Sequence, residues 1–359
     1  MSEKEGINMK KNKIIILSII LIIFLLNPKT INLIKDKVNS SEIKINKIKE
    51  ISLEHGKNIS FLKYKQGFLI YDGKSLNYIN SKAERIFSLN IRIENYSIDT
   101  NESNIYILDK IKNEAYIVDK KGSLIKKISI KDKPIIIKAL KGDNFLIQYS
   151  TNVEVEGVKI YDIEGNEIKN ISIPKITINT VETDLNTGGF LISGIIIENE
   201  SLYNNIFYYN KKGELLFSDN IENKIFIKTM FLNDKIILVD PKYIELRDEE
   251  FESLNKINLD ENIKYITLID DYIVIIDKLG RIIYIDEKGN KKIENHPIKN
   301  AKGIEKMEKE SIIYSDGSIY FTKHKKTYDF SKDIVNVLNL DDKSLIVIFR
   351  GSIEFLNID

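Results

Sequence analysis

Few side chains in this sequence are of the types that catalyse reactions or bind metal ions. The 359 residues include no cysteine and three histidines, His55, His296 and His324. Without cysteine there is no disulfide, thiolate metal ligand or thiol nucleophile. The histidines lie far apart, none belongs to an H-x-x-x-H pattern, and Gly-x-Ser-x-Gly does not occur. We therefore predict no catalytic residue, no metal site and no cofactor.

Two polar segments carry the best candidates for a ligand site. They lie in 184–189 and 198–203, within the longest interval of the repeat described below. The second segment joins the second and third strands of its unit, and Glu154 and Glu156 occupy the equivalent connection of the preceding unit. If these two connections share a face, four carboxylates would gather near one rim and attract a cation or a basic partner. The alternative is ordinary solvated loops. The candidate ligand-binding residues are Asp184, Glu198, Glu200 and Tyr203.

The charge balance argues against a nucleic-acid partner. Lysine and arginine number 54 and aspartate and glutamate 53, for a net charge of +1. Binding to nucleic acid relies mainly on a basic surface that neutralises phosphates. No such excess is present here, so we predict no nucleic-acid binding.

An apolar segment near the N-terminus predicts a membrane anchor. Residues 14–26 are apolar except for Ser18, and Lys10, Lys11 and Lys13 precede them. This bias of lysine predicts a cytoplasmic tail (1–13), a single transmembrane helix (14–26), a tether (27–41) and an extracellular remainder. Thirteen residues are short for a bilayer, so a cleaved signal peptide and a buried helix are the alternatives.

A repeated unit of about 40 residues fills the rest of the chain. Each unit has a strand of alternating apolar residues, a turn of the form Asp/Asn-x-x-Gly, and a further strand. The clearest turns begin at Asp119, Asp162, Asn210 and Asp286. Aspartate or asparagine opens such a turn through its own backbone and glycine supplies the positive φ, so we interpret these residues as structural corners.

The length of the repeat predicts an all-β fold, a β-propeller of about eight four-stranded blades, with seven as the alternative. Weaker turns at Asn80, Arg247 and Lys323, and a truncated unit that ends at Asn357, complete the count. The last unit lacks its fourth strand. Residues 42–48 alternate like an outer strand and can complete that blade, which would close the ring and cover an exposed sheet edge. The predicted propeller spans 42–359.

A lysine-flanked anchor followed by Ile-Tyr-x-x-Asp-x-x-Gly units resembles uncharacterised membrane-anchored propeller-like proteins of low-G+C Gram-positive bacteria. More distantly, the units are similar to quinoprotein-like and WD40-like repeat propellers and to outer-membrane assembly propellers. Those propellers typically carry a tryptophan in each repeat, and this chain has none. The resemblance implies a fold and a membrane location, and it transfers no catalytic residue.

Fold alone does not define function, so two hypotheses remain. The first is a non-enzymatic, membrane-tethered extracellular scaffold that binds a protein or a cell-wall polymer. The second is an extracellular enzyme that acts on carbohydrate, with carboxylates and tyrosines near the central opening. The absence of a catalytic pattern favours the first.

Overall fold

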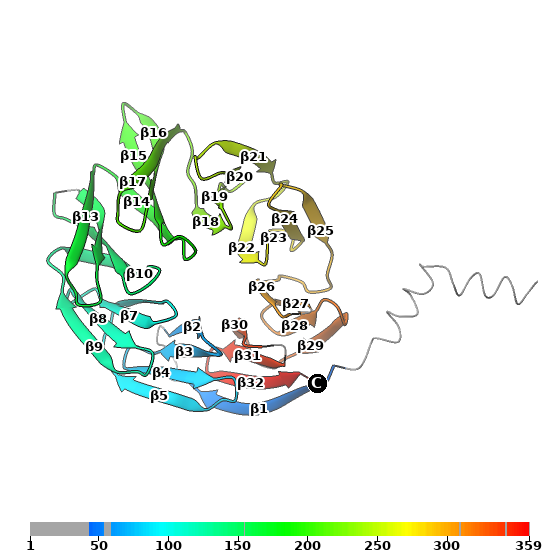
Figure 1. Cartoon of the computed structure of the whole chain (residues 1–359). Coiled ribbons are helices and arrows are strands. Elements are labelled where there is room, and N and C mark those ends of the chain that lie inside the picture. The colour runs from blue at the N-terminus through cyan, green and yellow to red at the C-terminus, as the bar shows by residue number, and fades with distance from the viewer. Residues whose placement is uncertain (1–42, 54–58, 154, 309, 342, 359) are drawn as a thin grey trace, which may run out of the picture.

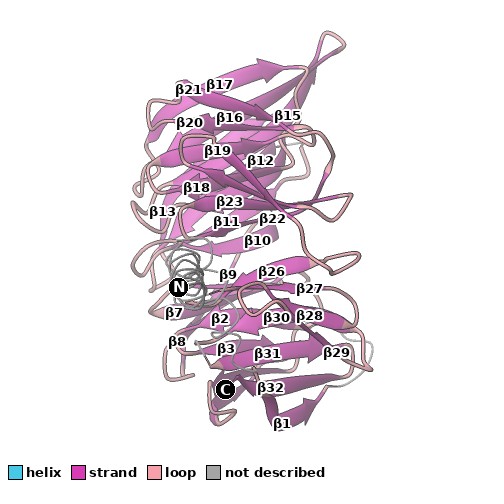
Figure 2. Ribbon diagram, turned by 90° about the vertical axis from the view of Figure 1, so that its right-hand side faces the viewer, coloured by secondary structure: helices cyan, strands magenta, loops and turns pink. Residues whose placement is uncertain are grey.

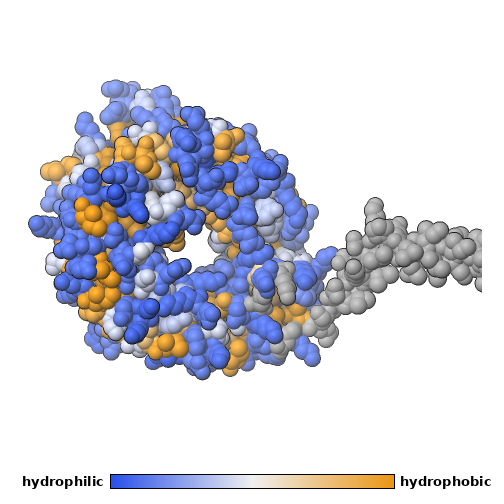
Figure 3. Space-filling model, in the orientation of Figure 1, coloured by the Kyte–Doolittle hydropathy of each residue, from blue (hydrophilic) through white to orange (hydrophobic). Residues whose placement is uncertain are grey.

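The computed structural model describes residues 43–53, 59–153, 155–308, 310–341 and 343–358. Within these ranges the chain forms eight four-stranded antiparallel sheets. The sheets stand around an open central channel, like blades in a ring (Figures 1 and 3). The prediction of an all-β propeller with eight blades is therefore confirmed.

The first four blades follow one another along the chain, each from its innermost to its outermost strand (Figure 1). Blade 1 consists of β2 (Ser60–Tyr64), β3 (Gly67–Tyr71), β4 (Ser75–Asn80) and β5 (Arg85–Asn90). Blade 2 consists of β6 (Tyr96–Thr100), β7 (Asn104–Asp109), β8 (Glu114–Asp119) and β9 (Leu124–Ser129). Blade 3 consists of β10 (Lys133–Ala139), β11 (Phe145–Ser150), β12 (Val155–Tyr161) and β13 (Glu167–Pro174). Blade 4 consists of β14 (Thr177–Thr183), β15 (Phe190–Glu198), β16 (Ser201–Tyr209) and β17 (Leu215–Glu222).

The remaining blades repeat this order, except that the last one borrows a strand from the beginning of the chain. Blade 5 consists of β18 (Lys228–Leu232), β19 (Lys235–Val239), β20 (Tyr243–Arg247) and β21 (Ser253–Asn258). Blade 6 consists of β22 (Ile263–Ile269), β23 (Tyr272–Asp277), β24 (Ile282–Asp286) and β25 (Lys291–Glu294). Blade 7 consists of β26 (Gly303–Lys306), β27 (Ser311–Tyr314), β28 (Ser318–Phe321) and β29 (Lys326–Asp329). Blade 8 consists of β30 (Ile334–Asn339), β31 (Ser344–Phe349), β32 (Ser352–Ile358) and β1 (Ile45–Ser52).

The position of a strand within its blade follows from its apolar pattern. The second strands carry nearly continuous apolar residues and are buried on both faces, as in β7 and β23. The fourth strands are largely exposed, as in β9. Because each blade packs both faces against its neighbours, the core is divided into separate apolar clusters between adjacent blades.

The predicted Asx-Gly corners close the outer hairpins. At Asp162 the Oδ1 atom accepts a hydrogen bond from the backbone N–H of Asn166 at 2.7 Å, and the carbonyl accepts one from Gly165 at 3.0 Å. Gly165 has a φ of 83°, which side chains other than glycine rarely adopt. The side chain and the carbonyl group of Asp162 thus both bind backbone N–H groups of the turn itself, and the prediction of structural corners is confirmed.

The predicted segment does close the ring, but its strand begins and ends later in the sequence than the predicted 42–48. Strand β1 begins at Ile45, pairs with Ile358, and runs antiparallel to β32 up to Ser52. Phe68 of blade 1 and Phe355 of blade 8 pack with their ring centroids 5.7 Å apart. The pairing covers the outer edge of β32, which would otherwise present unpaired backbone groups.

The topology defines two faces of the ring. We call the side on which β1 begins and β32 ends the proximal face; it carries the connections between first and second and between third and fourth strands. The opposite side, the distal face, carries the connections between second and third strands and those between blades. Figure 2 views the ring edge-on.

The predicted tail, anchor and tether (1–41) lie outside the described residues. Of the residues that the structure describes, none forms a helix long and apolar enough to cross a membrane.

Candidate functional site

Apolar side chains mark the distal face. Among the described residues, the four most exposed large apolar side chains are Val153, Ile197, Leu279 and Ile111, with exposed fractions of 77%, 73%, 67% and 62%. Each lies at or beside a connection between the second and third strands of its blade, in blades 3, 4, 6 and 2 respectively. Exposure of large apolar side chains to water is unfavourable, and their location on one face makes that face a candidate surface for contact with a partner.

The second hairpin of blade 4 is built from the two longest of the described strands and has its turn on this face. Strands β15 and β16 contain nine residues each, and they extend beyond the neighbouring strands at the upper edge of the ring (Figures 1 and 2). Their turn consists of Asn199 and Glu200, which have φ angles of 48° and 66°. Two successive positive φ angles match the right-handed twist of a hairpin, so this sequence stabilises a long, regular projection.

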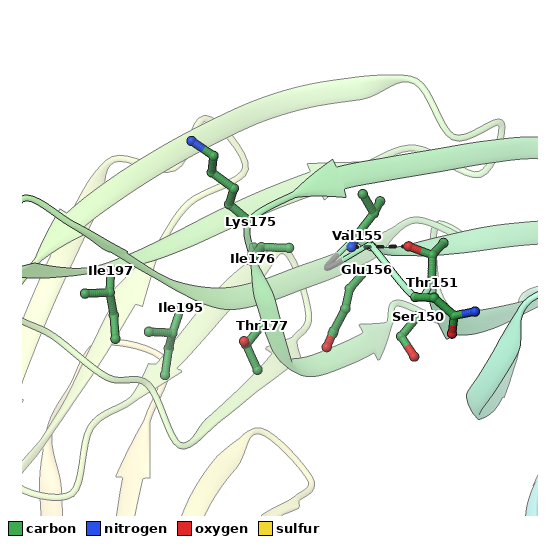
Figure 4. Close-up of a pocket in the computed structure, with 10 residues that line it drawn as sticks. Ser150, Thr151, Val155, Glu156, Lys175, Ile176, Thr177, Ile195 and Ile197 are labelled. Carbon is green, nitrogen blue, oxygen red and sulfur yellow. Dashed lines mark hydrogen bonds between the residues drawn. The ribbon is translucent and has the colours of Figure 1, made fainter.

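A cavity of about 650 Å³ lies beside this hairpin, between blades 3 and 4. In Figure 4 the side chains of Glu156, Thr177, Ile195 and Ile197 point in one direction, whereas that of Lys175 points the opposite way. The volume lies within the range of ligand pockets, about 300–1,000 Å³. The cavity is lined by Ser150, Thr151, Asn152, Val155, Glu156, Lys175, Ile176, Thr177, Ile195 and Ile197.

Glu156 is held in place at the boundary between these two blades. Its Oε2 accepts a hydrogen bond from the backbone N–H of Ile178 at 2.9 Å and one from Nε2 of Gln148 at 3.4 Å. A carboxylate that accepts such bonds is positioned to complement a donor or a cation. With the hydroxyl groups of Ser150, Thr151 and Thr177 and three isoleucines, the lining combines polar and apolar groups, as binding pockets do.

The predicted site residues lie at opposite ends of blade 4. Glu198, Glu200 and Tyr203 belong to the distal end of the hairpin, whereas Asp184 follows β14 at the proximal face. The length of β15, about 25 Å at its ordinary rise per residue, separates Asp184 from Glu198. As expected, the connections that carry Glu156, Glu198 and Glu200 share one face, whereas Asp184 lies apart from them. Glu154 lies outside the described residues.

Asp184 has a local structural role. It is buried, and its Oδ1 accepts a hydrogen bond from the N–H of Asn186 at 2.9 Å while its Oδ2 accepts one from the hydroxyl group of Thr187 at 2.5 Å. These bonds stabilise the turn between β14 and β15. A ligand contact at Glu198, Glu200 and Tyr203 stays a prediction.

The central channel is lined by the first strands of the blades and contains ionisable groups. Lys138 of blade 3 and Glu182 of blade 4 form an ion pair at 3.4 Å. Burial raises the pKa of Glu305, on β26, to about 7, although Lys63 acts in the opposite direction. Burial also raises the pKa of Asp99, whose Oδ2 accepts a hydrogen bond from the N–H of Ala139 at 3.0 Å. These groups join neighbouring blades.

The two described histidines have partners other than serine or threonine hydroxyl groups. His296 Nε2 lies 2.5 Å from the carbonyl oxygen of Gly280, and burial lowers the pKa of its ring. His324 Nδ1 lies 2.8 Å from Glu310. Over the described ranges, no three histidine or acidic residues come together in a way that would hold a metal ion.

Sequence reasoning missed the apolar tips of the distal face and the cavity. One available signal was an apolar residue inside a polar connection, as in Lys110-Ile111-Lys112. The cavity had no such signal, because its lining comes from two blades whose contact depends on the ring.

The fold and the distal surface define the class of this protein as an eight-bladed β-propeller with a face suited to binding. Within that class, the chain belongs to the Family of unknown function (DUF5711), whose model matches residues 37–358. The comparison with curated proteins gives no match.

Solved structures agree with the propeller fold. BamB from Moraxella catarrhalis is similar with a TM-score of 0.59 and 13% identity, over 88% of this chain and 100% of that one. Sqt1 from Saccharomyces cerevisiae has a TM-score of 0.64 and 10% identity, over 88% and 99%. The computationally designed protein Ika8 has a TM-score of 0.64 and 10% identity, over 87% and 99%. At these identities the likeness concerns the fold alone.

Proposed function

We propose that this protein is a non-enzymatic scaffold, tethered to the membrane by residues 14–26, that binds a protein partner outside the cell through its distal face. The observation that carries the proposal is the location of the four most exposed large apolar side chains, which all belong to this face. Loops held by a rigid scaffold commonly carry binding residues.

The path of the chain supports this orientation. The tether leads into β1, which begins at the proximal face with Ile45 paired to Ile358. A tether of 15 residues reaches at most about 50 Å. Such a link keeps the proximal face nearer to the bilayer and leaves the distal face directed toward partners.

Site-specific photo-crosslinking on intact cells tests the proposal. A photoreactive amino acid at Ile111 or Ile197 should give the same saturable crosslinked band. Leu185, at the proximal face, and Leu216, on the outer strand β17, are matched controls because their exposed fractions of 55% and 56% are also high. Equal crosslinking at all four positions, or at the controls alone, would reject the distal face.

Protease treatment of intact cells tests the orientation independently. We expect cleavage of the propeller without lysis of the cells. Complete protection of the propeller until the membrane is broken would place it inside the cell.

A further inference from the structure

We infer that the groove between blades 3 and 4 binds an extended peptide segment of the partner by strand addition to β15, and that this peptide carries a basic side chain. This inference rests on the proposed function and names the class of ligand for the same face. Three features support it: an open backbone edge at Ile197, the adjoining cavity, and the charge of the hairpin.

The open edge follows from the strand register. Glu198 and Ser201 flank a two-residue turn, so they form a hydrogen-bonded pair, and such pairs alternate along antiparallel strands. The backbone N–H and C=O of Ile197 therefore point away from β16. On that side, β14 begins at Thr177, which pairs with Ile195, so among the described residues Ile197 is paired with Leu202 of β16 and with no residue of β14.

An unpaired edge of this kind is the template to which an extended peptide adds. The cavity continues from Ile195 and Ile197 to Glu156 and Ser150, so a peptide beside β15 would have space for its side chains. Val153, 77% exposed, lies in the chain between Asn152 and Val155, two residues of the cavity lining. Alternate peptide side chains would contact apolar groups at the rim and polar groups deeper inside.

The charges around the groove favour a basic peptide. Glu198 and Glu200 lie at the tip of the hairpin and Glu156 lies in the lining, whereas Lys175 is the one basic residue among the described residues of the lining. In Figure 4 the side chain of Lys175 points away from the space toward which Glu156 points. A lysine or arginine of the peptide would thus meet mainly carboxylates, and its binding would weaken with added salt.

Replacement of Ile197 by proline tests the contribution of the Ile197 backbone N–H to peptide binding. Proline lacks the N–H group, and it is tolerated where that group faces solvent at a strand edge. Ile197→Pro should therefore keep the thermal midpoint close to that of the parent chain. Ile196→Pro should lower it clearly, because Ile196 lies in a hydrogen-bonded pair with Tyr203. A midpoint for Ile197→Pro as low as that for Ile196→Pro would contradict the register argument.

The binding experiment uses a phage-displayed library of eight-residue peptides, selected on the full chain. We expect enrichment of alternating apolar sequences with lysine or arginine. Selected peptides should bind the Ile197→Val control unchanged and lose about tenfold or more in affinity on Ile197→Pro. Amide hydrogen exchange of the unmodified chain provides a second readout, since bound peptide should slow exchange at Ile197.

Several outcomes would overturn the inference. Peptides that bind Ile197→Pro as tightly as the parent, or unchanged exchange at Ile197, would exclude strand addition. Self-association of the chain that Ile197→Pro abolishes, without enriched peptides, would assign the groove to a second copy. If crosslinking at Ile111 succeeds while Ile197→Pro has no effect on peptides, the distal face binds by another route and the proposed function stands.

Discussion

Glu305 illustrates how one residue acquires unusual chemistry from its surroundings. It lies on β26, the innermost strand of blade 7, where burial disfavours its charged form. Glu305 also affects two neighbouring tyrosines, Tyr265 and Tyr314. Burial is the main cause that raises the pKa of both tyrosines, and the charge of Glu305 raises it further. Ionisation of Glu305 therefore acts against the folded ring.

Replacement of Glu305 by glutamine should stabilise the protein at neutral pH. In the folded chain its pKa is about 7, above the ordinary 4.5, so the unfolded chain loses the proton first as pH rises. The parent protein thus loses stability between pH 4.5 and 7, by up to roughly 3 kcal/mol. Glu305→Gln should show this gain at pH 8 and little gain at pH 4, measured by urea unfolding.

A control of opposite sign distinguishes this effect from a general response to loss of charge. Glu182→Gln removes the ion pair with Lys138, so it should lower stability slightly at pH 8. A gain for Glu305→Gln that does not vary with pH would contradict the burial argument.

At the scale of the elements, the corner turns of the outer hairpins have two roles: they reverse the chain, and they pack against the neighbouring blade. Gly165 ends the corner that Asp162 opens, and an added Cβ would lie 2.1 Å from Cγ2 of Ile128 on the outer strand of blade 2. Gly142 lies in the connection between β10 and β11 with a similar φ of 83°, and a Cβ there would meet no described atom within 4 Å.

The two glycines form a matched pair for substitution by alanine. Gly142→Ala should lower the free energy of unfolding by about 1 kcal/mol, because of the positive φ at this position alone. Gly165→Ala should cost more, by roughly 1–3 kcal/mol, because Ile128 must move. Equal losses in chemical denaturation would show that the contact between turn and neighbouring blade is unimportant.

For the molecule as a whole, stability depends on how the two ends of the ring are joined. Lys332 lies 2.5 Å from Glu50 of β1 and 2.8 Å from Glu354 of β32, and Lys47 also contacts Glu50. Hydrogen bonds from Lys332, then Lys47, lower the pKa of Glu50 to about 2. These charges reinforce the backbone pairing that closes blade 8.

Glu50→Gln should therefore lower the thermal midpoint in a pH-dependent way. The folded pKa lies below the ordinary 4.5, so the stabilisation is present above pH 4.5 and is lost as pH falls toward 2. The midpoints of variant and parent should differ at pH 7 and converge near pH 2. Glu102→Gln, in an exposed turn of the proximal face, is the control and should differ little at either pH. Failure to converge would exclude the ionised form of Glu50 as the cause.

The sequence by itself determined the repeating architecture. Strand alternation and Asx-Gly corners act over a few residues, so Asp162 and Gly165 predict their own turn, and the alternating segment 42–48 predicts a closing strand. Its observed bounds, Ile45–Ser52, differ because register depends on the partner strand.

Tertiary structure alone decided the surface and its chemistry. Asp184 and Glu198 share one polar interval of the sequence, yet they lie on opposite faces because β15 runs between them. The groove beside Ile197 and the burial of Glu305 each involve neighbouring blades. Exposure, cavities and pKa values arise from contacts between residues distant in sequence, which a local pattern does not contain.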